Sequence, residues 1–318
     1  MPSVHVVGSL NADQLLELSV FPERGETVLS SGTRVTAGGK GGNQAVAAAR
    51  AGARTAMVGV TGDDAHGRLV RAALAEAGVG TAAVRADPEA PTGLAVVLLE
   101  PGGGNRIIVA SGANNRVGER DVEAGLAAVE PGDVVLLQLE IPPATVAHAA
   151  RRARARGATV MLNAAPAPTD ARHLDPAYLD VLVVNAHEAR AVARLFGVTE
   201  GAPEDQAPSL ARALDALVVC TAGDRGAYAV PAGGREPVLH VPAVPVPAVD
   251  TTAAGDTFTG YLAAALAEGA NASDLPAALH RAAAAAALAV TRHGAAESIP
   301  DLDEVLRTRF TSPLTSRE

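Results

Sequence analysis

Two aspartates, six residues apart, flank a turn of small residues in the segment 249–260, VDTTAAGDTFTG. The apolar spacing from Phe258 to Gly269 predicts a helix that begins at this turn. Between Asp250 and Asp256 lie three residues with no bulky side chain: Ala253, Ala254 and Gly255. A phosphate can therefore approach the free backbone N–H groups at the start of the helix, where the helix dipole favours an anion. The pattern indicates an anion hole for phosphoryl transfer.

Asp256 is the candidate general base. At the start of the helix its carboxylate lies beside the bound anion, where it can accept the proton of a substrate hydroxyl that attacks phosphorus. Aspartate is also a common N-terminal helix cap. This segment by itself leaves both roles open.

A second glycine-rich segment, 38–44, reads GGKGGNQ. It is not a Walker P-loop, because Lys40 is followed by Gly41, and it lacks the third glycine of the dinucleotide-binding pattern, because Gln44 stands there. One interpretation is a flexible turn before a helix at 43–51. The other is an exposed backbone on which a polyhydroxyl substrate lies, with Asn43 bonding a hydroxyl and Lys40 reaching toward it or toward phosphate.

Short apolar runs alternate with Ala- and Leu-rich stretches along most of the chain. We expect strands at 4–7, 56–60, 134–139, 158–162, 181–184, 216–220 and, broken by prolines, 241–249; helices are expected at 43–51, 64–77, 143–156 and 258–269. The alternation predicts an α/β fold with a mostly parallel sheet covered by helices on both faces. Ligands of such folds bind beyond the carboxyl ends of the strands. Six candidate residues follow predicted strands: Gly8, Glu140, Asn163, Asn185, Thr221 and Asp250.

Two stretches, about 14–37 and 92–111, lack helical periodicity. Extended pieces at 15–20 and 27–35 and a hairpin of 94–99 with 106–110, around the turn 101–104, predict a separate small sheet. Apolar residues on both faces of so small a sheet would expose a sticky surface. We therefore expect it to pair with a second subunit.

Composition excludes several classes of protein. The net charge of −9 argues against a nucleic-acid partner, and the single cysteine, Cys220, excludes an internal disulfide and a Cys-cluster metal site. The eight histidines show no zinc-ligand spacing. No basic segment or long apolar run precedes 4–7, so we expect no signal peptide, no membrane span and a cytoplasmic location. The 2% aromatic content means that the core is built from Ala, Val and Leu.

Seven ordered motifs resemble the ribokinase family of carbohydrate kinases. Besides the segments 38–44 and 249–260, they are GSLNAD at 8–13, QLE at 138–140, NAHE at 185–188, TAGDRG at 221–226 and AVTRHGA at 289–295. The resemblance implies a three-layer α/β/α kinase domain, 1–13, 38–91 and 112–310, with a β lid, 14–37 and 92–111, and a C-terminal tail, 311–318. It also implies a homodimer formed through the lid.

The activity implied by the resemblance is ATP-dependent phosphorylation of the 5-hydroxyl of D-ribose. An alternative is a kinase of another furanose or a nucleoside, such as deoxyribose, fructose or adenosine. Another is a sugar-binding protein without catalysis, although both Gly255 and Asp256, which that protein would be expected to lose, are present.

The family's sugar-binding positions correspond here to Asn11, Asp13, Gly39, Lys40, Gly41, Gly42, Asn43, Glu140 and the base Asp256. On a strand, residues 11 and 13 point to the same face and can hold adjacent hydroxyls. Without the other motifs, Asp13 would be interpreted as a surface turn residue and Glu140 as a helix cap.

The resemblance also implies a nucleotide site and two cation sites. The nucleotide would contact Asn185, Thr221, Ala222, Gly223, Asp224, Arg225, Gly226 and Gly255. Mg²⁺ would be held by Glu188 through water, although a first-turn helix acid is also common, and K⁺ by Asp250, Thr252, Ala289, Arg292, Gly294 and Ser298. The sequence departs from the family at Ala283, where Asn or His is usual and an adenine contact is in doubt, and at 163–166, NAAP in place of NPAP.

Overall fold

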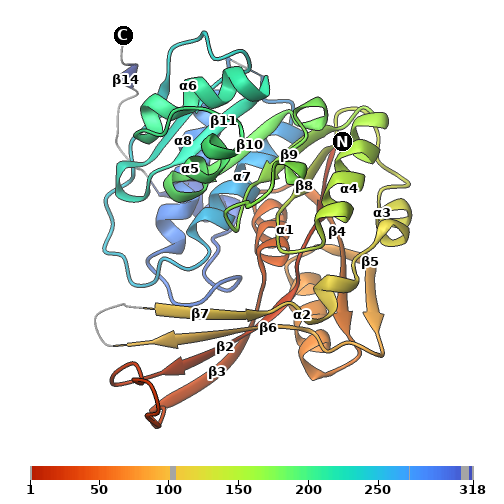
Figure 1. Ribbon diagram of the computed structural model, residues 1–318, viewed down its shortest axis with the longest axis vertical. Coiled ribbons are helices and arrows are strands. Elements are labelled where there is room, and N and C mark those ends of the chain that lie inside the picture. The colour runs from red at the N-terminus through yellow and green to blue at the C-terminus, as the bar shows by residue number, and fades with distance from the viewer. Residues whose placement is uncertain (1, 101–104, 272, 309–314, 317–318) are drawn as a thin grey trace.

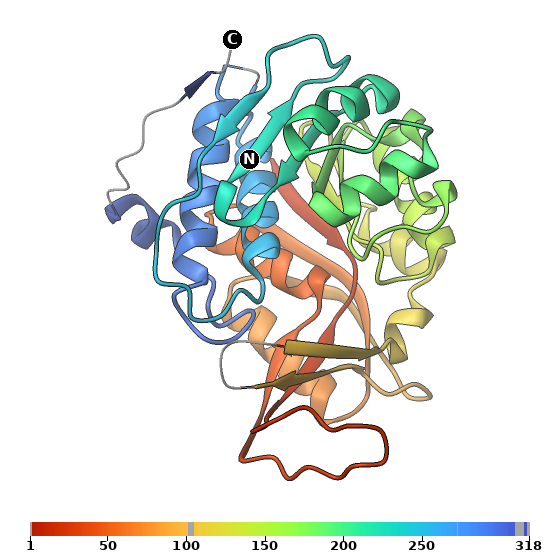
Figure 2. The same ribbon diagram turned by 60° about the vertical axis from the view of Figure 1, so that its left-hand side comes forward.

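The computed structural model describes residues 2–100, 105–271, 273–308 and 315–316 (Figures 1 and 2). Within these ranges, ten strands form one large sheet in the order β14-β13-β12-β11-β10-β9-β8-β1-β4-β5. Their bounds are β1 Ser3–Val7, β4 Arg54–Gly62, β5 Gly80–Asp87, β8 Val134–Leu137, β9 Thr159–Asn163, β10 Val181–Asn185, β11 Leu217–Thr221, β12 Ala227–Val230, β13 Leu239–Val241 and β14 Thr315–Ser316. The strands from β11 to β5 pair in parallel, and β12, β13 and β14 pair antiparallel at one edge.

Helices cover both faces of this sheet, as Figure 2 shows. One face carries α1 Lys40–Arg50, α2 Ala65–Glu76, α7 Ala254–Ala267, α8 Leu275–Ala289 and α9 Leu302–Arg307; the other carries α3 Glu119–Gly125, α4 Pro143–Ala155, α5 Ala186–Leu195 and α6 Pro203–Leu214. Alternate residues of one strand enter different cores: Val134 and Leu136 pack with α7, and Val135 and Leu137 with α4. The predicted three-layer α/β/α architecture is confirmed.

The strand order reverses between β1 and β8. From β1 the chain continues outward to β4 and β5, whereas β8 leads outward to β9, β10 and β11 on the other side. The loops that leave the carboxyl ends of such a strand pair diverge and open a crevice. Gly8 and Gln138 are the first residues beyond these two ends.

A separate four-stranded sheet, β3-β2-β6-β7, lies beyond the large one (Figure 1). It consists of β2 Asn11–Glu17, β3 Gly32–Gly38, β6 Gly93–Leu99 and β7 Asn105–Ala110. The predicted hairpin is formed by β6 and β7, and its turn at 101–104 lies outside the described residues. β2 begins at Asn11 and β3 ends at Gly38, so both strands reach the glycine-rich motif at one end of the small sheet.

Several predicted boundaries are wrong. The segment 241–249 is a strand only at Val241, because Pro242, Pro245 and Pro247 have no backbone N–H to donate to a ladder. The helices predicted from 43 and 258 begin at Lys40 and Ala254, so both small-residue motifs form first helical turns. The predicted tail, 311–318, lies outside the described residues except Thr315–Ser316, which pair with β13. Among the described helices, none is long and apolar enough to span a membrane.

Candidate active site

The first turn of α7 carries Asp256, whose side chain is buried. Its Oδ2 accepts a hydrogen bond from Asn43 Nδ2 at 3.0 Å, and its Oδ1 accepts one from Gln44 Nε2 at 2.8 Å. The N-cap of α7 is Ala253, and no side chain caps the helix. Asp256 is therefore not the cap, and its carboxylate bonds to α1 instead.

The turn before Asp256 has the open backbone that the sequence predicts. Ala253 adopts a left-handed conformation, with φ 58° and ψ 7°, which is rare for a residue with a side chain. A Cβ on Gly255 would meet no atom within 4 Å, so open space lies in front of this residue. The Ala254 N–H makes only a long hydrogen bond, 3.3 Å, to Thr251 O. The role of these residues as an anion hole stays a prediction.

The glycine-rich motif packs against the segment that follows β1. Gly39, with φ 86°, is the N-cap of α1, and a Cβ there would lie 2.7 Å from Asn11 N. A Cβ on Gly41 would lie 2.6 Å from Ser9 N. The prediction of an exposed glycine loop is wrong at Gly41 and Gly42, which are buried in the first turn of α1. Glycine is required at Gly39 and Gly41 because two backbone segments meet here without room for a side chain.

Two of the predicted sugar-binding residues carry a buried oxygen that has no hydrogen-bond partner among the described residues: Asp13 Oδ1 and Asn43 Oδ1. Asp13 lies on β2 and not on a surface turn. An unpaired buried oxygen is costly in the free protein, and hydroxyl groups are the donors that would satisfy these two acceptors. Asn11, also on β2, already accepts a hydrogen bond from Asn114 Nδ2 at 2.7 Å.

Glu140 lies in the loop that leaves β8, at the crevice between β1 and β8. Its Oε2 accepts hydrogen bonds from Ser9 Oγ at 2.5 Å and from Lys40 N at 3.2 Å. The N-cap of α4 is Pro142, so Glu140 does not cap that helix. The carboxylate instead ties the start of α1 to the end of β1.

Four carboxylates surround Lys40. Burial by itself would lower the pKa of Lys40, but Asp256, Glu140, Glu188 and Asp13 together raise it above its ordinary value. Burial raises the pKa of Asp13 to about 7, with further contributions from Glu140 and Asp256 that Lys40 partly offsets. The site therefore holds one fixed positive charge and, near neutral pH, an Asp13 carboxyl that is partly protonated.

Two adjoining cavities differ in chemistry. One, of about 210 Å³, is polar and is lined by residues that include Lys40, Asn185, Glu188 and Asp256. The other, of about 490 Å³, has mainly apolar walls from 243–248, Phe258 and the α8 alanines 283, 286 and 287. Thr221, Thr251 and Gly255 line both. Together they suit a ligand with a flat apolar body and an anionic chain directed at Asp256.

The predicted nucleotide loop divides into residues that reach this space and residues that do not. Thr221, Gly223, Asp224 and Gly226 line the apolar cavity. Ala222 is not among the lining residues, and Arg225 pairs with Glu204 at 3.3 Å. Ala283, the departure noted in the sequence, lines the same cavity, so its wall there has no hydrogen-bonding side chain.

Asn185 and Glu188 form the capping box of α5. Asn185 Oδ1 accepts from the N–H groups of His187 and Glu188, and Glu188 Oε2 accepts from Asn185 N at 2.8 Å. Glu188 therefore caps α5, as the structural alternative predicts, and it also lines the polar cavity. Burial raises the pKa of Glu188, and Asp256 adds to this effect.

The loop after α8 folds back onto Asp250. Asp250 Oδ2 accepts from Gly294 N at 3.0 Å, and Oδ1 accepts from Thr252 N at 2.9 Å. Burial would raise the pKa of Asp250, but these hydrogen bonds keep it below its ordinary value. Of the other predicted potassium ligands, Ala289 O accepts from Arg292 N and Ser298 Oγ donates to Ala295 O. The structure brings Asp250, Thr252 and Gly294 together.

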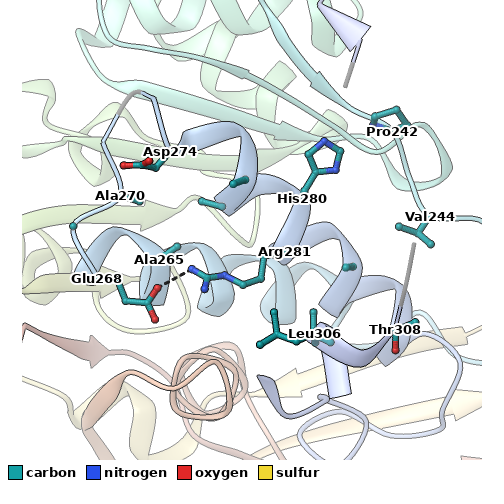
Figure 3. Close-up of a pocket in the computed structure, with 15 residues that line it drawn as sticks. Pro242, Val244, Ala265, Glu268, Ala270, Asp274, His280, Arg281, Leu306 and Thr308 are labelled. Carbon is teal, nitrogen blue, oxygen red and sulfur yellow. Dashed lines mark hydrogen bonds and ion pairs between the residues drawn. The ribbon is translucent and has the colours of Figure 1, made fainter. Parts of the chain in front are cut away.

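A further cavity, of about 560 Å³, lies at the other end of α7, between the ends of α8 and α9 (Figure 3). An ion pair of Glu268 with Arg281, at 2.8 Å, borders it. None of the predicted site residues lines this cavity. Among the described residues there is also no group of three or more His, Cys, Asp or Glu side chains that could hold a metal ion.

Sequence reasoning assigned no role to the hydrogen-bonding residues around Asp256: Ser9, Gln44, Asn114, Gln138 and Asn163. All except Asn114 lie within or next to a predicted motif or strand end, but such amide and hydroxyl side chains also occur throughout protein surfaces. The available signal was their position, since Asn163 follows a predicted strand, Gln138 lies near the end of the strand predicted at 134–139, and Gln44 ends the glycine-rich motif. Their partners lie about 100 or 200 positions away in the chain.

The chain is similar to known proteins over most of its length. The model of the pfkB family carbohydrate kinases matches residues 1–302. The ribokinase of Haemophilus influenzae is 36% identical over 305 residues, which cover 95% of this chain and 96% of that protein. A deoxyribokinase of Salmonella typhi is 31% identical over 311 residues, 95% of this chain and 96% of that protein. The solved structure of Arabidopsis thaliana ribokinase complexed with ribose and ATP is 35% identical, with a TM-score of 0.83 and coverage of 96% of this chain and 98% of that one. The chain therefore belongs to the pfkB family of carbohydrate kinases.

Proposed function

We propose that this protein is an ATP-dependent ribokinase that phosphorylates the 5-hydroxyl of D-ribose. The observation that carries the proposal is the position of Asp256, which lies in the polar cavity beside the open turn at Gly255 and bonds to Asn43. The proposed base and the proposed anion-binding turn meet at this point, and Asn43, which bonds to Asp256, carries a buried unpaired oxygen. The ribokinase of Haemophilus influenzae and the ribose- and ATP-bound Arabidopsis enzyme support the choice of substrate.

In the proposed reaction, the apolar cavity holds adenine and the polar cavity holds the phosphates of ATP. The Asp256 carboxylate takes the proton of the 5-hydroxyl as its oxygen attacks the terminal phosphorus, and ADP leaves with the former bridging oxygen. The backbone amides at 253–255 and the Lys40 ammonium offset charge on the transferring group. The sequence predicts the same roles for Asp256 and for the turn at 253–255.

Deoxyribose is the alternative acceptor, since a deoxyribokinase is among the relatives. The unpaired Asp13 Oδ1 and Asn43 Oδ1 favour a sugar that offers more hydroxyl donors, because a substrate without one of them leaves a buried acceptor unpaired.

The test is ADP release from ATP and Mg²⁺ with D-ribose, 2-deoxyribose, fructose or adenosine. We expect the highest kcat/KM with ribose. A preference for another acceptor would support the assignment as a kinase but contradict the assignment of ribose as substrate. If none of these acceptors stimulates ADP release, the protein is not the proposed kinase.

We propose Mg²⁺ as a cofactor held near Glu188. A buried carboxylate that lines the polar cavity is an oxygen donor of the kind Mg²⁺ prefers, and one carboxylate with several waters is a common arrangement. Mg²⁺ would supply charge neutralisation at the ATP phosphates.

The variant Glu188→Gln separates this role from helix capping, because Gln also satisfies a capping box. We expect an increase of at least about tenfold in the Mg²⁺ concentration for half-maximal activity, as removal of a metal-site group typically gives, with an unchanged melting temperature. An unchanged Mg²⁺ requirement would remove Glu188 from the metal site.

We propose K⁺ as an activator bound by Asp250 and neighbouring backbone carbonyls. A carboxylate with its pKa held low, together with carbonyl groups, is a donor set of oxygens that suits a hard cation. We expect activation by KCl relative to choline chloride at equal ionic strength, and loss of this difference in Asp250→Asn.

A homodimer formed through the small sheet and a cytoplasmic location also stay predictions.

A further inference from the structure

We propose that Gln44 is a positioning residue for the reaction, and that a buried chain of three amide side chains, Gln138, Gln44 and Asn163, holds the Asp256 carboxylate in place. This inference rests on the proposed kinase function and deepens it. It assigns a role to residues that were not among the predicted site residues.

The three amides and Asp256 come from four different elements. Gln44 lies on α1, Asp256 on α7, Gln138 just after β8 and Asn163 at the end of β9. The Gln44 Nε2 atom donates both of its hydrogens, to Asp256 Oδ1 at 2.8 Å and to Asn163 Oδ1 at 2.9 Å. Gln138 Nε2 in turn donates to Gln44 Oε1 at 2.6 Å.

These bonds fix which end of the Gln44 amide faces the carboxylate. Because Gln44 Oε1 is occupied by a donor from Gln138, the Gln44 amide can present only N–H to Asp256. Asn163 is held in turn by a hydrogen bond from its Nδ2 to Val183 O at 3.1 Å. A flipped Gln44 amide would set oxygen against the Asp256 carboxylate and would lose all three hydrogen bonds.

Packing leaves the chain little freedom. The Gln44 and Gln138 side chains are fully buried, and Asn163 is buried. A Cβ on Gly8 would lie 1.8 Å from Gln138 Oε1, so only glycine leaves room for this amide. Gln44 and Asn163 have both ends of their amides paired, whereas Gln138 Oε1 has no partner among the described residues. Buried hydrogen-bonded amides of this kind rigidify a site.

The arrangement also separates the two carboxylate oxygens. Oδ1 accepts from Gln44, and Oδ2 accepts from Asn43, whose own Oδ1 is buried and unpaired. A hydroxyl that bonds to Asn43 is thereby brought to Oδ2. We infer that Oδ2 receives the proton and that Gln44 keeps Oδ1 turned away from the substrate.

The test compares Gln44→Met with Gln206→Met in the full-length enzyme. Gln206 is a matched control, because it is a buried glutamine on α6 whose side-chain N and O have no partner among the described residues. Loss of positioning in Gln44→Met should lower kcat on the order of 10²-fold, the effect of displacing a reacting group by about 1 Å. Ribose affinity, measured by calorimetry without ATP, should change by less than about threefold. Gln206→Met should keep wild-type kcat.

A second readout separates positioning from a general packing defect. Because Gln44 donates to the charged form of the carboxylate, its loss should move the acid limb of the kcat profile to higher pH. The charged groups that interact with Asp256, namely Lys40, Asp13 and Glu188, are the same in both variants. The acid limb of the kcat profile of Gln206→Met should coincide with that of the wild-type enzyme.

A third comparison uses Gln138, which reaches Asp256 only through Gln44. Gln138→Met should lower kcat in the wild-type background, and it should change kcat by less than about twofold in the Gln44→Met background. If Gln44→Met fails to fold, Gln138→Met alone tests the inference, through its kcat and the acid limb of its pH profile.

Several results would overturn the inference: a wild-type kcat in Gln44→Met, an equal loss in Gln206→Met, a loss confined to ribose affinity, or an unmoved acid limb. Failure of the proposed function looks different, because the wild-type enzyme itself would then release no ribose-dependent ADP. The same variants would in that case be compared with whichever acceptor the wild-type enzyme uses.

Discussion

Asp256 has the contacts expected of a base that is held before substrate binds. In Asp256→Asn, the amide oxygen can still accept from Gln44, but the amide nitrogen faces Asn43 Nδ2, which is also a donor, so that contact requires Asn43 to turn its unpaired Oδ1 toward residue 256. The rest of the sugar site should persist. Turnover should fall by about 10²–10⁴-fold, since the proton acceptor is lost. Single-turnover kinetics measure the fall in turnover, and calorimetry with ribose measures whether the sugar site persists. A variant with near-normal turnover would show that Asp256 is not the base.

Asp13, a predicted sugar ligand, should make the stability of the protein depend on pH. Its pKa is about 7 in the folded protein and 3.8 without burial, so the folded state binds the extra proton between these values. Stability therefore falls as pH rises from about 4 to about 7, and above pH 7 the cost of the ionised Asp13 is fully present, up to about 4 kcal/mol.

Asp13→Asn should relieve this cost. We expect the melting temperature of the sugar-free variant to exceed that of the wild type by more at pH 8 than at pH 5, and ribose to bind more weakly because an acceptor is lost. Thermal unfolding at both pH values tests the trend. Asp303→Asn, at an exposed carboxyl on α9, is the control and should show no such trend. An equal shift at both pH values would contradict the assigned role of Asp13.

At the scale of elements, the crossing of α1 and α7 decides whether the site forms. Asn43 and Gln44 come from α1 and Asp256 from α7, and the helices touch at Gly260. A Cβ on Gly260 would lie 2.5 Å from Ala47 Cβ and 2.6 Å from Gln44 O. Small residues at the crossing therefore bring the amides within reach of the carboxylate.

Gly260→Ala should push the two helices apart. Such overpacking costs about 1–3 kcal/mol of stability, and a displacement of about 1 Å at Asp256 should lower kcat on the order of 10²-fold. Denaturant unfolding and steady-state kinetics measure the two effects. Gly80→Ala on β5 is the matched control, because a Cβ there meets its nearest atom only at 3.4 Å. Wild-type kcat in Gly260→Ala would mean that the site tolerates a wider crossing.

At the scale of the whole molecule, the small sheet exposes apolar side chains that the described residues do not cover. Ile107, Ile108 and Val109 of β7 are each about half exposed or more, and Val35 of β3 is also exposed. Contiguous exposed apolar residues on a sheet edge are typical of an interaction surface. This supports the predicted homodimer through the lid.

Ile108→Lys should weaken that dimer, because the charge would be buried at the interface. Sedimentation velocity should show a shift from dimer to monomer. Leu306→Lys on α9 is the control, since both side chains have the same exposed fraction, 64%. If the wild-type protein is a monomer, or if both variants stay dimeric, the lid is not the interface.

Much of this architecture follows from local patterns. The alternation of apolar runs and helical stretches placed strands such as β9 and β10 to within one residue, because a buried parallel strand is a continuous apolar run. The predicted ends of helices and strands are wrong where glycine and proline are frequent. The start of α1 at Lys40 was missed because glycines are poor helix formers, and tertiary contacts with Ser9 and Leu10 outweigh that preference.

The sequence by itself determined the fold class, the base candidate and the nearby motifs, because each depends on residues close together in the chain. Only the tertiary structure decided how those motifs meet. It showed that Asp256 is not a helix cap, that Glu140 bonds to Ser9, and that the amide chain from Gln138 reaches Asp256. Such contacts join residues more than 90 positions apart, and their geometry depends on the crossing of α1 and α7 and on the strand order at β1 and β8. Residue types and local spacing do not specify that geometry.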